Sequence, residues 1–377
     1  MNKKSSLPHN SSPWTLAPER IQAIDALRGF DMFWLTGGLA LFLTGAHLFF
    51  SPLPPWLIYH TNHVAWEGFA VWDMVMPLFI FIVGTAMPFS FAKRTHESGK
   101  GMIYLKILRR TLLLFLLGMV VQGNLLSFNF QHMRLFCNTL QAIAGGYLIA
   151  SLCLLHLSIK GQIITMLTLL IGYWLCIEWI PFGNHPAGTL LPNANLPLFI
   201  DCYLEGPHQD GTDYAWILPQ LAFGALTLLG VLGGHILKHL HTPSQKLGSL
   251  VFSGLICLVL GYVWSLQLPI IKHLFTSSMV LWAAGWCFLL LAFFYLMTDI
   301  LKLGWLAFPL KVLGSNAIFI YMWTTVLPPQ SSISRVLFSG FAGLFNPYNG
   351  LVFQLCNYAL IWSIMYYLYK KKTFLKV

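Results

Sequence analysis

Two histidines and one aspartate stand out where a polar connection leads into an apolar helix. The segment HTNHVAWEGFAVWDMVMPLFIFIVGTAMPFS contains His60, His63 and, about one turn into the helix, Asp73. A histidine here could act as a general base or as a nucleophile that carries an acyl group, and a nearby carboxylate would orient its ring. The alternative is an interfacial histidine satisfied by water, with Asp73 bonded to a neighbouring helix. An ionised group in hydrocarbon is expensive, which favours a functional site.

A second group of charges lies near the start of the first apolar run. Asp25, Arg28 and Asp31 are spaced three apart, so their side chains approach one another on neighbouring helical turns. This pattern predicts a buried ion network. Alternatively, Arg28 would bind a phosphate or carboxylate of a ligand, because a guanidinium group binds both bidentately.

The composition indicates a membrane protein built from helices. Of 377 residues, 57% are hydrophobic and only 9% are charged, and many apolar runs reach the length needed to span a bilayer. The net charge of +10 does not indicate a nucleic-acid partner, because the basic residues occupy short connections between apolar runs. The seven cysteines form no CxxC pair and no Cys/His metal spacing, so neither a disulfide framework nor a metal site is predicted.

We therefore predict an all-α polytopic bundle of about ten transmembrane helices. Residues 1–19 form a disordered cytoplasmic tail without a cleavable signal peptide, and residues 20–377 form a single transmembrane domain. The apolar piece at residues 336–345 is too short to cross and is predicted to be re-entrant or interfacial. The ten predicted spans are residues 20–50, 69–91, 111–128, 134–157, 162–181, 216–237, 247–268, 278–298, 309–327 and 351–369.

The distribution of lysine and arginine predicts the orientation of these spans. With both termini in the cytoplasm, 18 of the 22 basic residues fall on that side and one more lies within the first helix. Only Arg134, Lys272 and Arg335 fall outside. His63 then lies on the non-cytoplasmic side, opposite the basic connection that contains Arg94, Arg109 and Arg110, which could also hold a phosphorylated ligand.

A long polar interval, residues 182–215, is predicted to be an extracytoplasmic loop without evident secondary structure. It contains four acids and no lysine or arginine. The acids suit a cationic acceptor by electrostatic complementarity. The alternative is that outside loops are simply poor in basic residues. The acids are Asp201, Glu205, Asp210 and Asp213.

Three motifs resemble the heparan-α-glucosaminide N-acetyltransferase family, and particularly its bacterial members, within a wider superfamily of transmembrane acyltransferases. An Asp-x-x-Arg-Gly helix is matched at residues 25–29, a His-x-x-Trp-x-Gly turn at residues 63–68 and an Asp-x-x-x-Pro helix at residues 73–77. Arg134 with Leu140-Gln141, and Gly314-Ser315-Asn316-Ala317, are weaker echoes. The resemblance touches most of the chain and is specific mainly over residues 20–94.

The resemblance implies transfer of an acetyl group from cytoplasmic acetyl-CoA to an amine, or a hydroxyl, of an extracytoplasmic amino sugar or glycan. It implies His63 as the catalytic histidine, either as base or as acyl carrier. By the logic of hydrolase triads, Asp73 would hold its ring. The candidate donor-binding residues are Arg28, Arg94, Arg109 and Arg110, and the candidate substrate-binding residues are Trp66, Glu67 and Asn316.

Other functions remain open at this point. Intramembrane Asp, Arg and His also serve proton relays, so a proton-coupled transporter of a small sugar or amine is the alternative, and a scaffold with a degenerate site is a third. The absence of a targeting peptide fits a bacterial plasma membrane. Membrane lipid, acyl-CoA and the acceptor are the expected partners, without nucleic acid or metal, and the sequence leaves a homodimer open.

Overall fold

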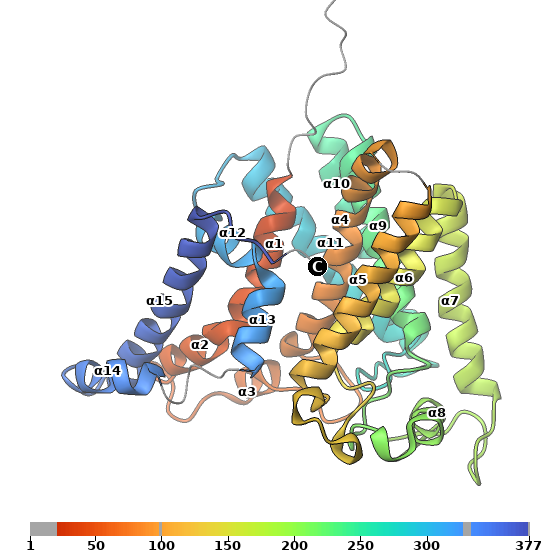
Figure 1. The fold of residues 1–377 in the computed structure, drawn as a ribbon, viewed down its shortest axis with the longest axis horizontal. Helices are drawn as coiled ribbons and strands as arrows, with labels where there is room; N and C mark the ends of the chain where they lie inside the picture. The colour runs from red at the N-terminus through yellow and green to blue at the C-terminus, as the bar shows by residue number, and fades with distance from the viewer. Residues whose placement is uncertain (1–20, 98–99, 327–332, 376–377) are drawn as a thin grey trace, which may run out of the picture.

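Long apolar runs fold as helices in a membrane because only a helix satisfies all of its own backbone hydrogen bonds. The computed structural model describes residues 21–97, 100–326 and 333–375, and helices dominate this part of the chain (Figure 1). The predicted tail, residues 1–19, lies outside the described residues.

The helices are α1 (Gln22–Phe33), α2 (Leu39–Ala46), α3 (Pro55–Thr61), α4 (Val75–Glu97), α5 (Lys100–Val121), α6 (Thr139–His156), α7 (Ile159–Trp179), α8 (Leu196–Glu205), α9 (Gln220–His239), α10 (Pro243–Ser265), α11 (Ser277–Tyr295), α12 (Phe308–Gly314), α13 (Ala317–Val326), α14 (Ile333–Gly343) and α15 (Asn349–Lys370), and the strands are β1 (Leu190–Leu191) and β2 (Ala194–Asn195).

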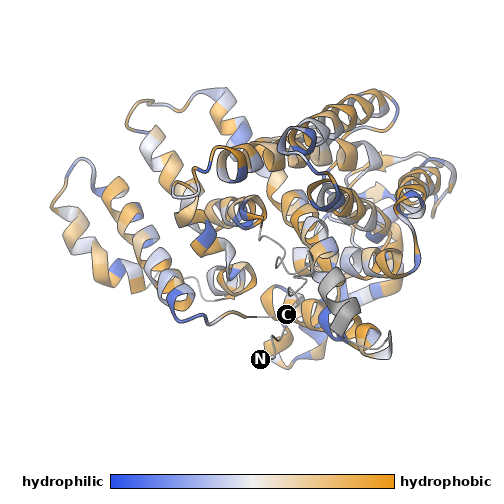
Figure 2. Ribbon diagram, turned by 90° about the horizontal axis from the view of Figure 1, so that it is seen from above, coloured by the Kyte–Doolittle hydropathy of each residue, from blue (hydrophilic) through white to orange (hydrophobic). Residues whose placement is uncertain are grey.

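The predicted class, an all-α polytopic membrane protein, is confirmed. Within the described ranges, eight helical segments are long and apolar enough to cross a membrane, and each coincides with a predicted span. The other two predicted spans correspond to α5, whose first half carries several basic residues, and to the pair α12 and α13, which is interrupted at Ser315 and Asn316. Hydrophobic residues run along the helices, and hydrophilic residues gather in the connections (Figure 2).

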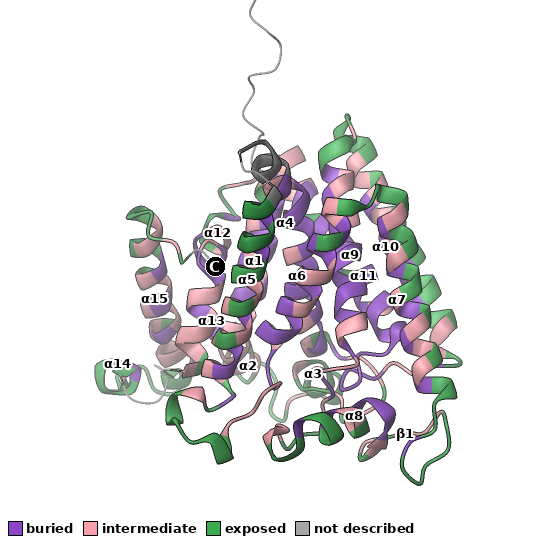
Figure 3. Cartoon of the chain, turned by 45° about the vertical axis from the view of Figure 1, so that its right-hand side comes forward, coloured by how far each residue is buried: buried purple, intermediate pink, exposed green. Residues whose placement is uncertain are grey.

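Four helices form the interior of the bundle. In α4, α6, α9 and α11 more than half of the spanning window is buried, whereas α7, α10 and α15 have 28%, 22% and 17% buried. Figure 3 shows this contrast as buried residues along the first group and exposed residues along the second. The large apolar side chains exposed on the outer helices are therefore suited to contact lipid.

The first predicted span, residues 20–50, is not one continuous helix. Helix α1 runs into a π turn at Trp34–Gly38, within which Thr36 and Gly37 leave the helical conformation, and α2 continues beyond it. Gly37 has a φ of 121°, a value that glycine adopts more readily than other residues. This break places Leu35 at the wall of the cavity described below.

Glycines allow two pairs of helices to cross at unusually short range. A Cβ atom on Gly230 of α9 would lie 2.2 Å from the carbonyl oxygen of Phe81 in α4. A Cβ atom on Gly29 of α1 would lie 1.7 Å from the carbonyl oxygen of Leu310 in α12. The glycine of the Asp-x-x-Arg-Gly motif is thus required by helix packing, as small residues are at other membrane helix interfaces.

The interval 182–215 is more structured than predicted. It contains the β1–β2 hairpin, in which Leu190 pairs with Asn195, and then helix α8. The Asn195 side chain accepts a hydrogen bond from the backbone N–H of Leu198 at 2.9 Å and caps α8, with Pro197 in its first turn. These are ordinary helix-start signals, and the prediction of an unstructured loop was wrong because it overlooked them.

The helices give the molecule two distinct ends. The C-terminal end of α4 and the first turns of α5 lie at one end of the bundle, and α3 and α8 lie at the opposite end (Figure 1). The short apolar piece predicted at 336–345 forms part of α14, which has 11 residues and packs against α15. At this length α14 is too short to cross a bilayer.

We predict that Gly230→Leu destabilises the bundle. The new side chain would meet the backbone of α4, which cannot move aside as a flexible side chain can, and overpacking of this kind typically costs about 1–3 kcal/mol. Thermal unfolding of detergent-purified protein measures the effect. Gly172→Leu in α7 is the matched control, because a Cβ there meets no atom within 4 Å. Equal melting temperatures for the two variants would contradict the packing argument.

Candidate active site

His63 and Asp73 are brought together by a turn that leads from α3 into α4. His63 follows α3, and Asp73 lies in a 3₁₀ turn, Val71–Met74, that opens α4. One carboxylate oxygen of Asp73 accepts the backbone N–H of Ala70 at 2.9 Å, which fixes the side chain at the start of the helix. The predicted pairing of the two residues is therefore present in the geometry.

The turn is attached to the connection between α10 and α11. The backbone N–H of Gly68 donates to the carbonyl of Ile270 at 2.9 Å, and Glu67 forms an antiparallel bridge with Ile271. Gly68 has a φ of 123°, in the region that favours glycine. These contacts hold Lys272, which follows immediately in that connection, beside His63.

Three charged or titratable groups meet at one point. The Nδ1 atom of His63 lies 2.7 Å from Oδ1 of Asp73, and Nζ of Lys272 lies 2.9 Å from that Nδ1 and 3.1 Å from that Oδ1. The Asp73 side chain is 1% exposed and that of Lys272 is 9% exposed, whereas that of His63 is 47% exposed. The two charges are thus removed from solvent while the imidazole stays accessible.

The hydrogen-bond pattern assigns the proton of the neutral imidazole. Nδ1 lies 2.7 Å from the Asp73 oxygen and 2.9 Å from the Lys272 ammonium nitrogen. A bare Nδ1 lone pair would be repelled by the carboxylate at the shorter of these distances, so we assign the proton to Nδ1, which donates to Asp73. Lys272 donates to the same carboxylate. Among the described residues no group is bonded to Nε2, which is left as an unprotonated and accessible base.

Burial lowers the pKa of the Lys272 ammonium from its ordinary value, although the neighbouring Asp73 carboxylate acts in the opposite direction. Burial likewise lowers the pKa of His273, the next residue in the connection. Both groups lie outside the membrane-spanning segments. The site therefore combines a buried ion pair with an imidazole that is not itself enclosed.

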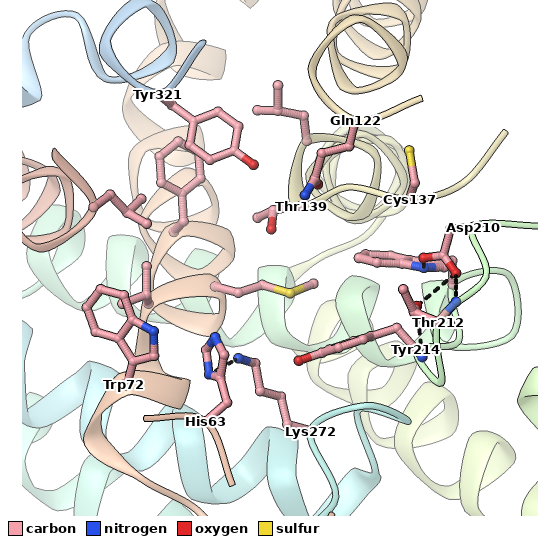
Figure 4. A pocket seen from close by; sticks show the side chains of 16 residues that line it. His63, Trp72, Gln122, Cys137, Thr139, Asp210, Thr212, Tyr214, Lys272 and Tyr321 are labelled. Carbon is pink, nitrogen blue, oxygen red and sulfur yellow. Dashed lines mark hydrogen bonds between the residues drawn. The ribbon is translucent and has the colours of Figure 1, made fainter. Parts of the chain in front are cut away.

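The His63 ring faces a cavity of about 390 Å³. Figure 4 shows His63, Lys272 and Trp72 on one side of this cavity and Gln122, Thr139 and Tyr321 across it. The lining is apolar and aromatic with a few polar groups, which is typical of a small-molecule site. Its lining residues are Leu35, His63, Trp72, Val75, Met76, Phe79, Gln122, Cys137, Thr139, Leu140, Asp210, Thr212, Tyr214, Trp216, Lys272 and Tyr321.

The other predicted residues of the histidine turn, Trp66 and Glu67, contact the connection that carries Lys272. The indole of Trp66 stacks on the ring of His273, with 5.3 Å between ring centroids, and its Nε1–H donates to the carbonyl of Leu190 at 2.8 Å. Glu67 is exposed, and its backbone forms the bridge to Ile271. Neither side chain is part of the cavity lining, so their predicted contact with substrate stays a prediction.

The described members of the predicted donor-binding set, Arg28, Arg109 and Arg110, have different surroundings. Arg28 lies 3.9 Å from Asp25 in the same helix, which accords with the predicted ion network, but Asp31 is buried and its carboxylate has no hydrogen-bond partner in the described chain. Arg109 is exposed on α5, and the guanidinium group of Arg110 lies over the ring of Tyr147 at 4.4 Å. The side chain of Arg94 lies outside the described residues.

Asn316 lies at the break between α12 and α13 and is buried. Its amide nitrogen donates to the carbonyl of Thr373 at 2.8 Å, and its amide oxygen accepts the N–H of Leu375 at 2.9 Å. Asn316 is not among the residues that line the cavity. Its contacts attach the C-terminal segment to the bundle, and its predicted role toward substrate stays a prediction.

Two of the four acids in the interval 182–215 are buried. Asp201 accepts backbone N–H bonds from Trp216 and Ile217, the latter at 3.1 Å. Glu205, one helical turn later in α8, is 4% exposed, and one of its oxygens has no partner among the described residues. Burial raises the pKa of Asp201 to about 7 and, together with Asp201, that of Glu205 to about 8. Of the four, Asp210 lines the cavity.

Sequence reasoning missed Lys272 as a site residue, although a signal was present. Lys272 and Arg134 are two of the three basic residues that depart from the predicted positive-inside pattern, and both have specific polar partners. Arg134 donates to the carbonyls of Pro207 and Gln209. A basic residue on the unexpected side of a membrane is thus a useful indication that it has a partner.

The fold and the site together define an all-α polytopic membrane protein with a histidine, aspartate and lysine cluster at one end. Residues 20–127 match a family described as a domain of unknown function, DUF5009. The chain is also 25% identical to heparan-alpha-glucosaminide N-acetyltransferase of Mus musculus, over 85% of this chain. The match spans 57% of the length of the mouse protein. The resemblance inferred from the motifs is therefore confirmed.

Among the described residues, no group of three or more His, Cys, Asp and Glu side chains is placed to hold a metal ion. The cavity presents an imidazole base next to a buried ion pair. Such a site can move a proton and stabilise developing charge.

We predict that the buried acids of α8 make the fold less stable as pH rises. Their folded pKa values lie above their ordinary values, so the stability they contribute is present at acid pH and lost as pH rises through about 7 and 8. In Glu205→Gln the fall in melting temperature between pH 6 and pH 9 should be smaller by roughly 2–4 °C. Glu67→Gln, at an exposed position, is the matched control. An equal fall in melting temperature in the wild-type protein and in both variants would contradict the raised pKa values of the α8 acids.

Proposed function

We propose that the protein is a membrane acyltransferase that moves an acetyl group from acetyl-CoA to the amine of an amino sugar. The donor would be held at the basic end of the bundle and the acceptor would enter the cavity at the opposite end. The observation that carries the proposal is the 2.7 Å contact between Nδ1 of His63 and Asp73, which leaves Nε2 as a base at the cavity.

The proposed reaction has a simple proton balance. The ammonium group of the acceptor first releases one proton to solvent. The neutral amine nitrogen then attacks the thioester carbonyl, a carbon–nitrogen bond forms and the carbon–sulfur bond breaks. Nε2 of His63 takes the proton that the amine loses and returns it to the departing thiolate. Asp73 holds the ring in the required tautomer and stabilises its cation, as a carboxylate does in hydrolase triads.

The cavity wall offers groups suited to an amino sugar. Trp72 and Tyr214 present aromatic rings, and the aromatic face attracts a cation as well as the apolar face of a sugar. The Asp210 carboxylate adds negative charge, while its own position is fixed by bonds from Thr212 and from the Trp216 indole at 2.9 Å. These groups attract a cationic amine into the cavity that the His63 ring faces.

The arrangement of charges supports delivery of the two substrates from opposite sides. Acyl-CoA carries several phosphates, and the first turns of α5 supply cations for them at the end of the bundle away from His63. Arg109 and Arg110 lie on α5, and Gln122, the residue that directly follows this helix, lines the cavity. Helix α5 therefore connects the basic end with the cavity.

We predict that His63→Ala abolishes acetyl transfer while the protein still folds. Loss of a positioned base typically lowers the rate by about 10²-fold or more. Transfer from labelled acetyl-CoA to glucosamine by detergent-purified protein measures the loss, and the melting temperature monitors the fold. His60→Ala is the matched control, because His60 is exposed in the same segment. Transfer that persists in His63→Ala, or is lost equally in both variants, would exclude His63 as the base.

A further inference from the structure

Lys272 is the member of the cluster that the proposed reaction does not use. It lies in the connection between α10 and α11, some two hundred residues from His63 in the sequence, and is 8% exposed. Its ammonium group contacts both the carboxylate of Asp73 at 3.1 Å and Nδ1 of His63 at 2.9 Å. A buried lysine is expensive unless it is paired, and here the pairing group is the carboxylate that orients the imidazole.

The distances make His63 sensitive to the charge of Lys272. A carboxylate alone at 2.7 Å would strongly favour the imidazolium form of the ring. A second cation at 2.9 Å disfavours that form, because two positive charges would then stand in direct contact. The two charges act on the same ring nitrogen from 2.7 and 2.9 Å and in opposite directions.

We propose that Lys272 is a positioning residue that keeps His63 uncharged by offsetting the Asp73 carboxylate, so that Nε2 remains available as a base. The value of this offset for catalysis rests on the proposed function, because acyl transfer requires an uncharged imidazole. Asp73 would orient the ring, and Lys272 would prevent that orientation from converting the ring to its cation.

The remaining charged groups near the ring do not replace Lys272. His273 belongs to the same connection, and its Nε2 lies 3.8 Å from Asp213. Tyr214 contacts His273 with 4.1 Å between ring centroids and approaches from the segment after α8. On the α4 side the His63 ring faces Trp72, which carries no charge. Among the described residues, only Asp73 and Lys272 contact Nδ1 directly.

A purely structural role for Lys272 makes a different prediction. If the ion pair with Asp73 only attached the α10–α11 connection to the start of α4, its loss would lower stability and lower the rate equally at every pH. If Lys272 offsets the carboxylate, its loss shifts the pH at which His63 becomes protonated. The pH dependence of His63 therefore separates the two roles.

The first experiment measures the reactivity of His63 without any acetyl transfer. Diethyl pyrocarbonate acylates only the uncharged imidazole, so the rate of modification of His63 against pH, read by mass spectrometry of the whole purified protein after digestion, reports its protonation. We expect the midpoint to move to higher pH by about one unit or more in Lys272→Met. Lys272→Arg, which keeps the charge, should restore the wild-type midpoint to within a few tenths of a unit.

His60 supplies an internal control in the same digest, because it is exposed and its midpoint should be the same in all proteins. If Lys272→Met does not purify as a folded protein, Lys272→Gln keeps a donor toward Asp73 without the charge and takes its place. An unchanged His63 midpoint in the neutral variant, or the same shift in Lys272→Arg, would overturn the proposal.

The second experiment records acetyl transfer against pH in the same proteins. We expect the acidic limb of kcat/KM to move upward with the modification midpoint in Lys272→Met, so that the lost rate recovers as pH rises. A uniform loss at every pH, with an unshifted modification midpoint, would assign Lys272 a structural role and overturn the proposal. A shifted midpoint in a protein that transfers no acetyl group would support the offset by Lys272 and count against the proposed function alone.

Discussion

The site depends on one buried carboxylate, that of Asp73. With 1% of its side chain exposed, this group could not remain ionised without partners, because desolvation of an isolated charge is far more expensive than any single hydrogen bond. Its partners come from two parts of the chain: the N–H of Ala70 and the ring of His63 belong to the turn before α4, and the ammonium group of Lys272 belongs to the α10–α11 connection. Satisfying Asp73 therefore brings together the groups that the proposed chemistry requires.

The rest of the bundle keeps that carboxylate in place. Helix α4 begins beside Asp73 and is held against α9 by the close glycine crossing at Gly230, so the start of α4 cannot shift without disturbing the interior. The α10–α11 connection is attached through the Glu67–Ile271 bridge, which brings Lys272 into contact. Helix packing and two short backbone contacts thus define positions that no single helix could define alone.

Much of this architecture could be predicted from the sequence because membrane helices have strong compositional signals. The apolar runs located eight spans, and the spacing of His63 and Asp73 around a helix start predicted their pairing. What could not be predicted is contact between segments distant in the sequence. Lys272 lies some two hundred residues from His63, and Tyr214 and Tyr321 join the cavity only after the helices have packed.

Two local errors had local causes. Helix α8 was missed because the prolines and acids around it suggested a loop, although Asn195 and Pro197 form a regular helix start. The first span was predicted as continuous because its residues are apolar, and the break at Thr36 and Gly37 depends on backbone angles that composition does not report. Neither error affects the His63 turn, where the structure contains the predicted contact between His63 and Asp73.

The central claim is that His63 serves an acceptor on the side of the membrane opposite the acetyl donor. The most direct measurement uses sealed vesicles with the first turns of α5 facing the lumen, labelled acetyl-CoA enclosed and glucosamine added outside. The account predicts labelled N-acetylglucosamine in the external medium, and none with the His63→Ala protein. Product that forms only when both substrates are on the same side would contradict it.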